Sequence, residues 1–465
     1  MVPSHFLLVA LPNRGAMNPA LLLAERLARV GSHVTFLTTV SAHRRMINPV
    51  RLEGVTITTF SDGYDDGRKP GVDSERFYAE MERRGSEALS GLIKYSFGRG
   101  LRITCALHTV IPWVDDVARS FQIESVLVWI QPASVFSIYY YYFNGYEDVI
   151  KNVTSQSCDT SSLIRLPGLP PLTNRDVPSF FNHENKYAFV LPKLQSQFEQ
   201  LTEGGNTKVV LVNTFDALEL EVLRGIGTLN LVGIGPVVPL RFLDAQNDNS
   251  SDKSSRGDLF RGSEDYFQWL NSKEEASVIY VAFGSMATLS KAQKREMACG
   301  LLETSRPFLW VIRESDGDDD ELIHKEELDK IGVIVPWCSQ TDVLSHPSIG
   351  CFLTHCGWNS TLESLACGVP MVAFPQFGDQ MTNAKLVQDV WKVGVRVSEI
   401  NEEGINVEGG EIKKCLELVM GGEEIGEGIR RHAKKWKDLA MEAFKEGGSS
   451  DRNLKAFVEE FSKVD

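Results

Sequence analysis

Short apolar runs, each about the length of a β-strand, alternate along the chain with stretches of helical periodicity. Strands that are apolar along their whole length are typical of parallel sheets with helices on both faces. The pattern therefore predicts an α/β fold of two doubly wound, Rossmann-like domains, with the ligand site at the carboxyl ends of the strands, in the cleft between the domains. The runs cover residues 6–11, 34–38, 55–60, 125–130 and 209–213, and then 278–283, 308–312, 333–336, 351–354 and 371–374.

A polar segment, "DAQNDNSSDKSSRGD" at 244–258, interrupts this alternation. Its Asn, Asp and Ser residues cannot contribute to a core, so it predicts a linker between the domains. The predicted organisation is an N-terminal domain over 1–243, a linker over 244–262, a C-terminal domain over 263–445, and a helix over 446–465 that packs back on the N-terminal domain.

The stretch "ALPNRGAMNPAL" at 10–21 predicts the end of a buried strand, a turn and a helix start. Asn18 is the expected N-cap and Pro19 the first helical residue, and the helix is expected to end before Gly31. Turns of this kind often carry a catalytic group. Here the turn contains Gly15, Ala16 and Met17, none of which can accept a proton.

Composition and charge narrow the function. The 465 residues are 43% hydrophobic and 24% charged, which is typical of globular proteins. A net charge of −14 argues against nucleic acid or an anionic membrane as partner and favours a small organic substrate. The sequence shows neither a signal peptide nor a membrane span, and its eight scattered cysteines fit free thiols. We therefore expect a cytoplasmic protein.

The densest chemistry lies between residues 337 and 380. The run 351–354 leads into His355, and a helix start follows at "HCGWNS". Backbone N–H groups at a helix start favour phosphate, and Asn359, Ser360 and His355 add donors there. Trp337 follows another strand and is suited to stacking on a flat base.

Three further residues complete this candidate site. Glu363 lies one helical turn further on, where it can accept from ribose hydroxyls. Asp379 and Gln380 follow the next strand and are suited to sugar hydroxyls. This arrangement predicts a site for a sugar nucleotide.

Each element also has a structural interpretation. The spacing from Ser360 to Glu363 matches a capping box, and Trp337 and Trp358 are residue types common in cores. The pair Cys351 and Cys356 lies near two histidines, but it lacks the second pair that a structural zinc site needs, so no metal is expected. The joint occurrence of all these residues favours the sugar-nucleotide site.

The 44-residue stretch from Trp337 to Gln380 resembles the signature box of plant family-1 UDP-glycosyltransferases. The likeness extends over the chain, including "QPASVFSIYYYYFNGY" at 131–146 and "FGSMA" at 283–287. It is greatest to the branch with anthocyanin 5-O-glucosyltransferases and enzymes that form glucose esters of carboxylic acids such as crocetin. The resemblance implies a GT-B fold, with UDP-glucose bound by the C-terminal domain, the acceptor by the N-terminal one, no metal cofactor and a monomeric protein.

The resemblance also implies roles for individual residues. Gln at the last box position accompanies glucose in the family, so UDP-glucose is the expected donor. The implied contacts are Trp337 and Cys338 with uracil, Gln340 and Glu363 with ribose, Ser285, His355, Trp358, Asn359 and Ser360 with the diphosphate, and Asp379 and Gln380 with the sugar.

The family general base is missing. Family members have a "GHxNP" loop in which the histidine removes the acceptor proton, usually oriented by an aspartate. This chain has "GAMNP", with Ala16 at the base position. The orienting position falls near His108 or Thr109, with Asp115 and Asp116 a few residues beyond.

Three explanations of Ala16 remain open. The substitution was introduced to trap substrate, which the otherwise intact loop favours; or a natural enzyme glucosylates carboxylates, which need no base; or the chain is a non-catalytic UDP-sugar-binding protein. A nicotinamide-dependent enzyme is disfavoured because no G-x-G-x-x-G motif follows the first strand. The acceptor is expected to be a phenolic, flavonoid or carboxylic plant metabolite. The aromatic run 139–143 and Tyr146 either line its pocket or pack in the core.

Overall fold

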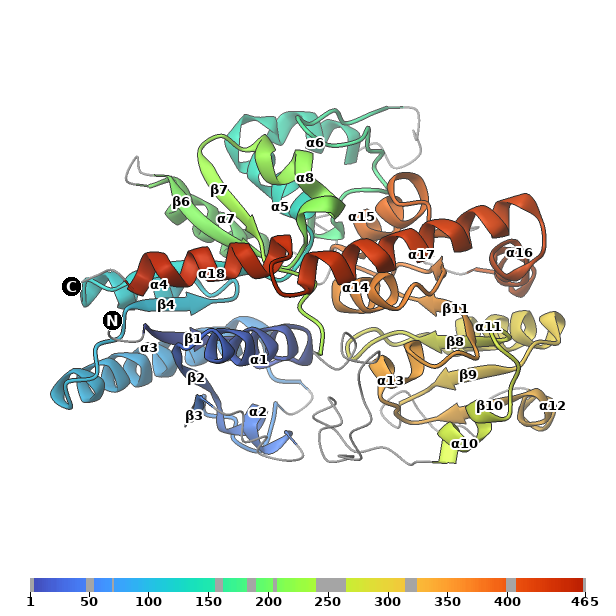
Figure 1. Cartoon of the computed structure of the whole chain (residues 1–465), viewed down its shortest axis with the longest axis horizontal. Coiled ribbons are helices and arrows are strands. Elements are labelled where there is room, and N and C mark those ends of the chain that lie inside the picture. Colours follow the sequence, from blue (N-terminus) through green and yellow to red (C-terminus); the bar gives the residue numbers. More distant parts are fainter. Residues whose placement is uncertain are drawn as a thin grey trace. The chain divides into compact units, whose positions relative to one another are not determined.

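The computed structural model describes residues 4–46, 54–68, 71–154, 162–181, 190–203, 207–239, 265–313, 324–398 and 407–462. The chain forms two compact units, each built around one sheet (Figure 1). Unit 1 consists of Met1–Asn174, Phe180–Val238 and Glu442–Asp465, and unit 2 of Arg175–Ser179 and Pro239–Met441. The predicted linker over 244–262 lies outside the described residues.

Unit 1 contains a seven-stranded parallel sheet in the order β3-β2-β1-β4-β5-β6-β7. The strands are β1 (His5–Val9), β2 (His33–Thr39), β3 (Val55–Phe60), β4 (Cys105–His108), β5 (Glu124–Trp129), β6 (Lys208–Val212) and β7 (Leu229–Gly233). The helices are α1 (Arg14–Arg29), α2 (Val40–Arg44), α3 (Ser74–Gly98), α4 (Pro112–Ser120), α5 (Ala133–Tyr141), α6 (Glu147–Thr154), α7 (Val190–Thr202), α8 (Asp216–Gly225) and α18 (Ser449–Ser462).

Unit 2 contains a six-stranded parallel sheet in the order β10-β9-β8-β11-β12-β13. The strands are β8 (Val278–Ala282), β9 (Phe308–Val311), β10 (Gly332–Val335), β11 (Ile349–Thr354), β12 (Met371–Ala373) and β13 (Gly394–Arg396). The helices are α10 (Asp265–Asn271), α11 (Lys291–Thr304), α12 (Lys325–Ile331), α13 (Gln340–Leu344), α14 (Trp358–Cys367), α15 (Gln380–Lys385), α16 (Gly409–Met420) and α17 (Glu424–Phe444), whose last residues belong to unit 1.

The predicted α/β class and the ten predicted strands are confirmed to within two residues at each end. Both sheets reverse their strand order once, between β1 and β4 in unit 1 and between β8 and β11 in unit 2. Ligands of doubly wound sheets bind at such switch points, beyond the carboxyl ends of the strands. The segments after these four strands are therefore the candidate functional loops.

The predicted start of the first helix is wrong. The helix begins at Arg14, and the side chain of Asn13 caps it by accepting the Ala16 N–H at 2.9 Å. Pro19 lies inside the helix, where it lacks the N–H of a regular helical bond. The predicted end is confirmed, because Gly31 follows the C-cap with a φ of +96°. An Asn-x-x-x-x-Asn-Pro sequence offers two caps, and the first one is used.

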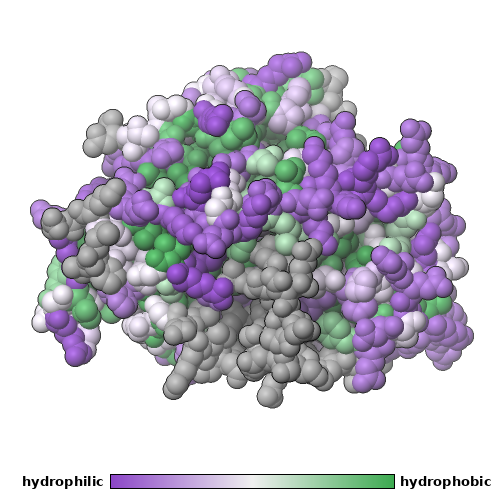
Figure 2. Space-filling view, viewed as in Figure 1, coloured by the Kyte–Doolittle hydropathy of each residue, from purple (hydrophilic) through white to green (hydrophobic). Residues whose placement is uncertain are grey.

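Helix α18 completes the core of unit 1. Its Phe457 stacks on Phe6 of β1 with ring centroids 5.7 Å apart, and Phe461 meets the same ring edge-on. The hydroxyl of Ser450, at the start of α18, donates to the Gly235 carbonyl. Figure 2 shows hydrophilic side chains along the outward sides of α17 and α18. The apolar side of α18 is therefore used inside unit 1.

Candidate functional site

The loop between β11 and α14 lies at the switch point of unit 2. Every residue of β11 is buried, and the chain then turns through Cys356, whose φ is +60°. Gly357 is the N-cap of α14, and Trp358 is its first residue. Because glycine has no side chain, this cap residue brings no acceptor of its own to the first N–H groups of the helix.

His355 lies between two glycines. A Cβ on Gly284, after β8, would lie 2.5 Å from its Nε2, and a Cβ on Gly357 would lie 2.4 Å from the same atom. Only glycine at both positions leaves room for the imidazole. Burial and the nearby charge of Arg313 lower the pKa of His355 to about 4. The side chain is therefore neutral at physiological pH and retains one N–H donor.

Three predicted site residues form one hydrogen-bonded cluster. The Gln340 Nε2 donates to Ser360 Oγ at 2.8 Å and to Glu363 Oε2 at 2.7 Å. Gly357, not Ser360, caps α14, so the capping-box interpretation is wrong. Tyr280 of β8, which sequence reasoning missed, donates to Gln340 Oε1 at 3.2 Å. The amide of Gln340 thus fixes both residues relative to the end of β10.

The two candidate tryptophans differ in environment. Trp337 follows β10 and is half-buried. Trp358 is buried and packs on Trp391 with ring centroids 5.8 Å apart. Cys338 is also buried, and its Sγ lies 3.3 Å from the Tyr280 hydroxyl. The indole of Trp358 therefore belongs to the core, and a ligand would meet the backbone of this residue and not its ring.

Asp379 and Gln380 lie at the start of α15. The Gln380 Oε1 accepts from the backbone N–H groups of Gln376 and Phe377, at 2.8 and 3.0 Å. Burial raises the pKa of Asp379 to about 6, although a 2.7 Å hydrogen bond from Asn383 opposes this shift. Because these two bonds occupy the side-chain oxygen of Gln380, its amide nitrogen is the group that can donate to a ligand.

The loop after β8 carries Ser285, which is exposed. The Arg313 guanidinium, after β9, donates to the Ala287 carbonyl and to Thr288 Oγ1, the latter at 3.3 Å. Arg313 was not predicted, because its contacts with this loop join residues about 25 positions apart, and no local pattern in the sequence indicates them. Asn383 was also missed, but its spacing of four residues from Asp379 on one helix was a readable signal.

In unit 1, Ala16 is the third residue of α1 and only 1% exposed. Thr109, after β4, is held near the same switch point, because its Oγ1 accepts the Leu11 N–H at 3.1 Å. Position 16 therefore lies in the first turn of α1, where the side chain is a buried methyl group.

The His108 side chain is closed off from solvent, so it is not a candidate for a general base. Its side chain is fully buried, and its Nε2 lies 3.1 Å from Asp115 Oδ1. Gln197 donates to the other carboxylate oxygen at 2.9 Å. Burial favours the protonated acid, but His108 and Gln197 outweigh it and hold the pKa of Asp115 below its usual range. Asp116 is exposed and accepts from Gln200 at 3.2 Å.

The aromatic run 139–143, at the end of α5 and just after it, packs mainly in the core. Tyr139 contacts Trp129 and Phe198, and Tyr142 contacts Phe181 with centroids 4.5 Å apart. Tyr139 is fully buried and Tyr142 nearly so. For these two residues the geometry fits the core interpretation rather than a pocket lining.

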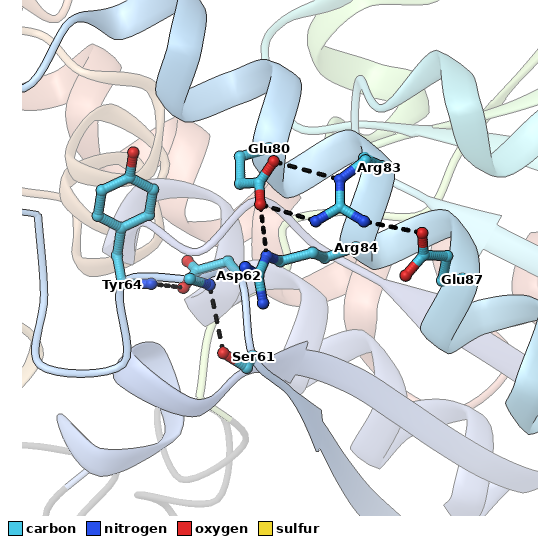
Figure 3. Close-up of polar contacts among 8 residues, drawn as sticks. Ser61, Asp62, Tyr64, Glu80, Arg83, Arg84 and Glu87 are labelled. Atoms are coloured by element: carbon cyan, nitrogen blue, oxygen red, sulfur yellow. Dashed lines mark hydrogen bonds and ion pairs between the residues drawn. The ribbon is translucent and has the colours of Figure 1, made fainter.

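A second polar group lies after β3, shown in Figure 3. Asp62 is buried and accepts the Tyr64 N–H at 2.9 Å, which closes a tight turn. On α3, the Glu80 carboxylate joins Arg83 and Arg84, and the Arg84 side chain points to the turn (Figure 3). This group shapes the edge of unit 1 and contains no predicted site residue.

The described residues contain neither a metal-binding cluster nor a membrane-spanning helix. Within those ranges, no group of three or more His, Cys, Asp and Glu side chains is arranged to hold a metal ion. No described helix is long and apolar enough to cross a membrane.

Comparisons with known proteins agree with this geometry. Residues 254–443 match the family "UDP-glucoronosyl and UDP-glucosyl transferase". The chain is 53% identical to phloretin 4'-O-glucosyltransferase of Malus domestica (99% of this chain, 98% of the relative). It is 52% identical to a chloroplastic crocetin glucosyltransferase of Gardenia jasminoides, with the same coverage.

A solved structure gives the same result at the level of fold. The crystal structure of Os79 from O. sativa in complex with UDP superposes with a TM-score of 0.85 and 30% identity, over 98% of this chain and all of that one. The predicted resemblance is thereby confirmed, and the two Rossmann-like units are those of the GT-B fold. The chain belongs to the plant family-1 UDP-glycosyltransferases.

Proposed function

We propose that the protein transfers glucose from UDP-glucose to a hydroxyl or carboxyl group of a small plant metabolite, with inversion at the anomeric carbon. The observation that carries this proposal is the cluster where Gln340 binds both Ser360 and Glu363 of α14, the helix that follows His355. These groups fit a ribose and a diphosphate. Relatives named as glucosyltransferases support glucose as the transferred sugar.

We assign the donor contacts by the part of UDP-glucose that each residue meets. Trp337 stacks on uracil and the Cys338 backbone binds its edge, while Gln340 and Glu363 hold the ribose. Asp379 and Gln380 bind the sugar. The diphosphate is held by Ser285, His355, Asn359, Ser360 and the backbone at Trp358.

In the reaction, the acceptor oxygen forms a bond to the anomeric carbon as the bond to the UDP oxygen breaks. Negative charge develops on the departing diphosphate, and fixed donors at the start of α14 stabilise it. A neutral His355 contributes one N–H donor. We propose that these donors act without a metal ion.

Position 16 affects which class of acceptor can react. A phenol or alcohol must lose a proton during attack, and Ala16 cannot take it. A carboxylate is already ionised near neutral pH and needs no base. The names of the relatives include both phloretin and crocetin, so both acceptor classes should be assayed.

The test is calorimetric titration with UDP and UDP-glucose, followed by transfer assays with phenolic and carboxylic acceptors. Binding together with glucoside formation supports the proposal. Absence of UDP binding at concentrations on the order of 1 mM contradicts the donor site. UDP binding without transfer to either acceptor class, before and after Ala16→His, favours the alternative of a non-catalytic UDP-sugar-binding protein.

Three further statements remain proposals. We propose that 1–243 binds the acceptor and 263–445 the donor, that the protein is a monomer and that it resides in the cytoplasm. Light scattering of the purified chain and imaging of a fluorescent fusion test the last two. The described cysteines are free thiols, which fits a reducing compartment.

A further inference from the structure

A five-residue piece of the N-terminal half belongs to unit 2. Arg175–Ser179 is assigned to unit 2, although the residues before and after it belong to unit 1. We call these five residues the docked segment. Its partners lie on β13, on α15 and in the turn before α15, so it packs beside the loop that carries Asp379 and Gln380.

The first anchor of the docked segment is a buried carboxylate. Asp176 is only 5% exposed, and its Oδ1 accepts from Arg396 Nη1 at 3.0 Å. Lys385 lies 3.7 Å from the other oxygen. The backbone is held as well, because Thr382 Oγ1 donates to the Asp176 carbonyl at 2.7 Å and Arg396 Nη2 to the Arg175 carbonyl at 3.0 Å. These contacts fix the segment to α15 and the end of β13.

The second anchor is a reciprocal pair. The Gly378 N–H donates to Ser179 Oγ at 2.7 Å, and the Ser179 N–H donates to the Gly378 carbonyl at 3.1 Å. Gly378 has a φ of +69° and directly precedes Asp379. Both polar groups of this glycine backbone are therefore bound by one serine.

The opposite side of the same loop is held by residues of the C-terminal half of the chain. Gln380 accepts two backbone N–H groups of the loop, and Asn383 Nδ2 donates to Asp379 and to the Cys356 carbonyl. The loop thus lies between the docked segment and the turn that carries His355. Removal of the outer support leaves the inner contacts in place.

We infer that the docked segment positions the sugar-contacting loop, with Ser179 and Asp176 as positioning residues that set the affinity for the donor sugar and the choice between sugars. The inference rests on the proposed function, since it assumes that Asp379 and Gln380 bind the sugar of UDP-glucose. Uracil, ribose and diphosphate contacts come from other loops, so UDP alone should not sense the segment.

The experiment compares affinities for UDP, UDP-glucose and UDP-galactose by calorimetry in the full chain. Ser179→Ala removes the hydroxyl that binds Gly378. We expect the Kd of UDP-glucose to rise about 3- to 10-fold, which corresponds to the loss of one partly buried hydrogen bond, while the Kd of UDP stays within about twofold. We also expect the preference for UDP-glucose over UDP-galactose to shrink.

Two companion variants make the result specific. Ser179→Thr keeps the hydroxyl and should restore both the affinity and the preference. Ser277→Ala is the matched control, because the Ser277 hydroxyl, also in unit 2, donates to the nearby Glu274 carbonyl at 2.7 Å. It should leave all three affinities unchanged.

Asp176→Asn tests the charged anchor. Loss of one partner of a buried ion pair is strongly destabilising, so this variant is judged only if it remains folded. If folded, it should weaken UDP-glucose more than Ser179→Ala does and leave UDP unchanged. If it unfolds, the serine variants decide.

The outcomes separate the inference from the proposed function. The inference is overturned if Ser179→Ala weakens UDP and UDP-glucose equally, or weakens neither. The proposed donor site still stands in both cases if the unaltered chain binds UDP normally. Failure of the unaltered chain to bind UDP overturns the proposed function first.

Discussion

The two switch points of the molecule have the same architecture and different chemistry. In unit 1, β1 leads into α1, whose cap Asn13 uses its side chain to accept the Ala16 N–H. In unit 2, β11 leads into α14, whose cap Gly357 has no side chain. At the start of α1, the cap side chain satisfies a backbone N–H group of the helix. At the start of α14, no cap side chain does so, and His355 and the hydrogen-bonded cluster of Gln340 lie in this region.

The difference shows how one supersecondary unit serves two tasks. A side-chain cap rigidifies the loop and can hold a single catalytic group on the third residue of the helix, which is position 16. A glycine cap lets the preceding histidine approach the helix start closely, as the two short Cβ distances at Gly284 and Gly357 show. Under the proposed function, the first arrangement would present a base at position 16, and the second would bind the diphosphate.

The largest expected effect comes from giving the unit 1 loop its base. Ala16→His should raise transfer to a phenol by roughly 10²–10⁴-fold, the usual contribution of a general base, and should change transfer to a carboxylate much less. Initial rates at saturating UDP-glucose measure both. Ala16→Asn is the control for size without basicity. Because the Ala16 methyl is buried, thermal unfolding of each variant must be checked as well.

Fast turnover of a phenol by the unaltered chain would falsify the assignment of the base to position 16. His108 would not then be the substitute, because its side chain is fully buried against Asp115.

The next effect concerns the platform for the base of the nucleotide. Trp337→Ala should weaken UDP by about 1–3 kcal/mol, the range for stacking of a base on an aromatic side chain. Trp337→Phe keeps a flat face and should lose less. Calorimetry with UDP measures both. Similar affinities for all three proteins would show that uracil lies elsewhere.

A smaller effect tests the start of α15. Gln380→His removes the oxygen that accepts two backbone N–H groups and should shift relative rates from UDP-glucose toward UDP-galactose, by roughly 3- to 10-fold. Gln380→Glu keeps an acceptor for those N–H groups and removes the amide donor, at the cost of an added negative charge beside Asp379. An unchanged ratio in both variants places sugar recognition on other residues.

The smallest expected effect is that of pH on the affinity for UDP-glucose. UDP-glucose has no group that titrates near neutrality, and the pKa of His355 is about 4, so affinity should stay level from about pH 6.5 to about pH 8.5. The pKa of Asp379 is about 6. Its carboxylate is therefore lost below that pH, and affinity should fall there. A steady fall from pH 6 to 8 would mean that a protonated histidine binds the diphosphate.

Much of the fold could be predicted because strands buried on both faces are apolar throughout. The strands that escaped prediction lack this signal: β4 has four residues, β7 alternates with the exposed Asn230, and β13 is three residues ending in Arg396. The helix start at Asn13 was missed because Asn18 and Pro19 carry the same local signal. Packing with the rest of the domain decides which of two possible N-caps begins the helix, and the local sequence contains no information on that packing.

The site divides in the same way. The box from Trp337 to Gln380 is contiguous, so its residues could be found together. The support from Tyr280, Arg313 and the docked segment depends on contacts between residues far apart in the chain. Asp176 and Arg396 are separated by 220 positions, and no spacing rule connects them.

The composition of unit 1 has a consequence for biosynthesis. Phe6 of β1 needs Phe457 and Phe461 of α18, which leave the ribosome only after all of unit 2 has been made. Unit 2 in turn needs Arg175–Ser179, which emerges before the rest of it. A nascent chain that has just completed unit 2 therefore still exposes the apolar surface around Phe6. We expect the two halves to be inseparable by a single cut, and any attempt to express 1–243 alone to yield a sheet with an uncovered face.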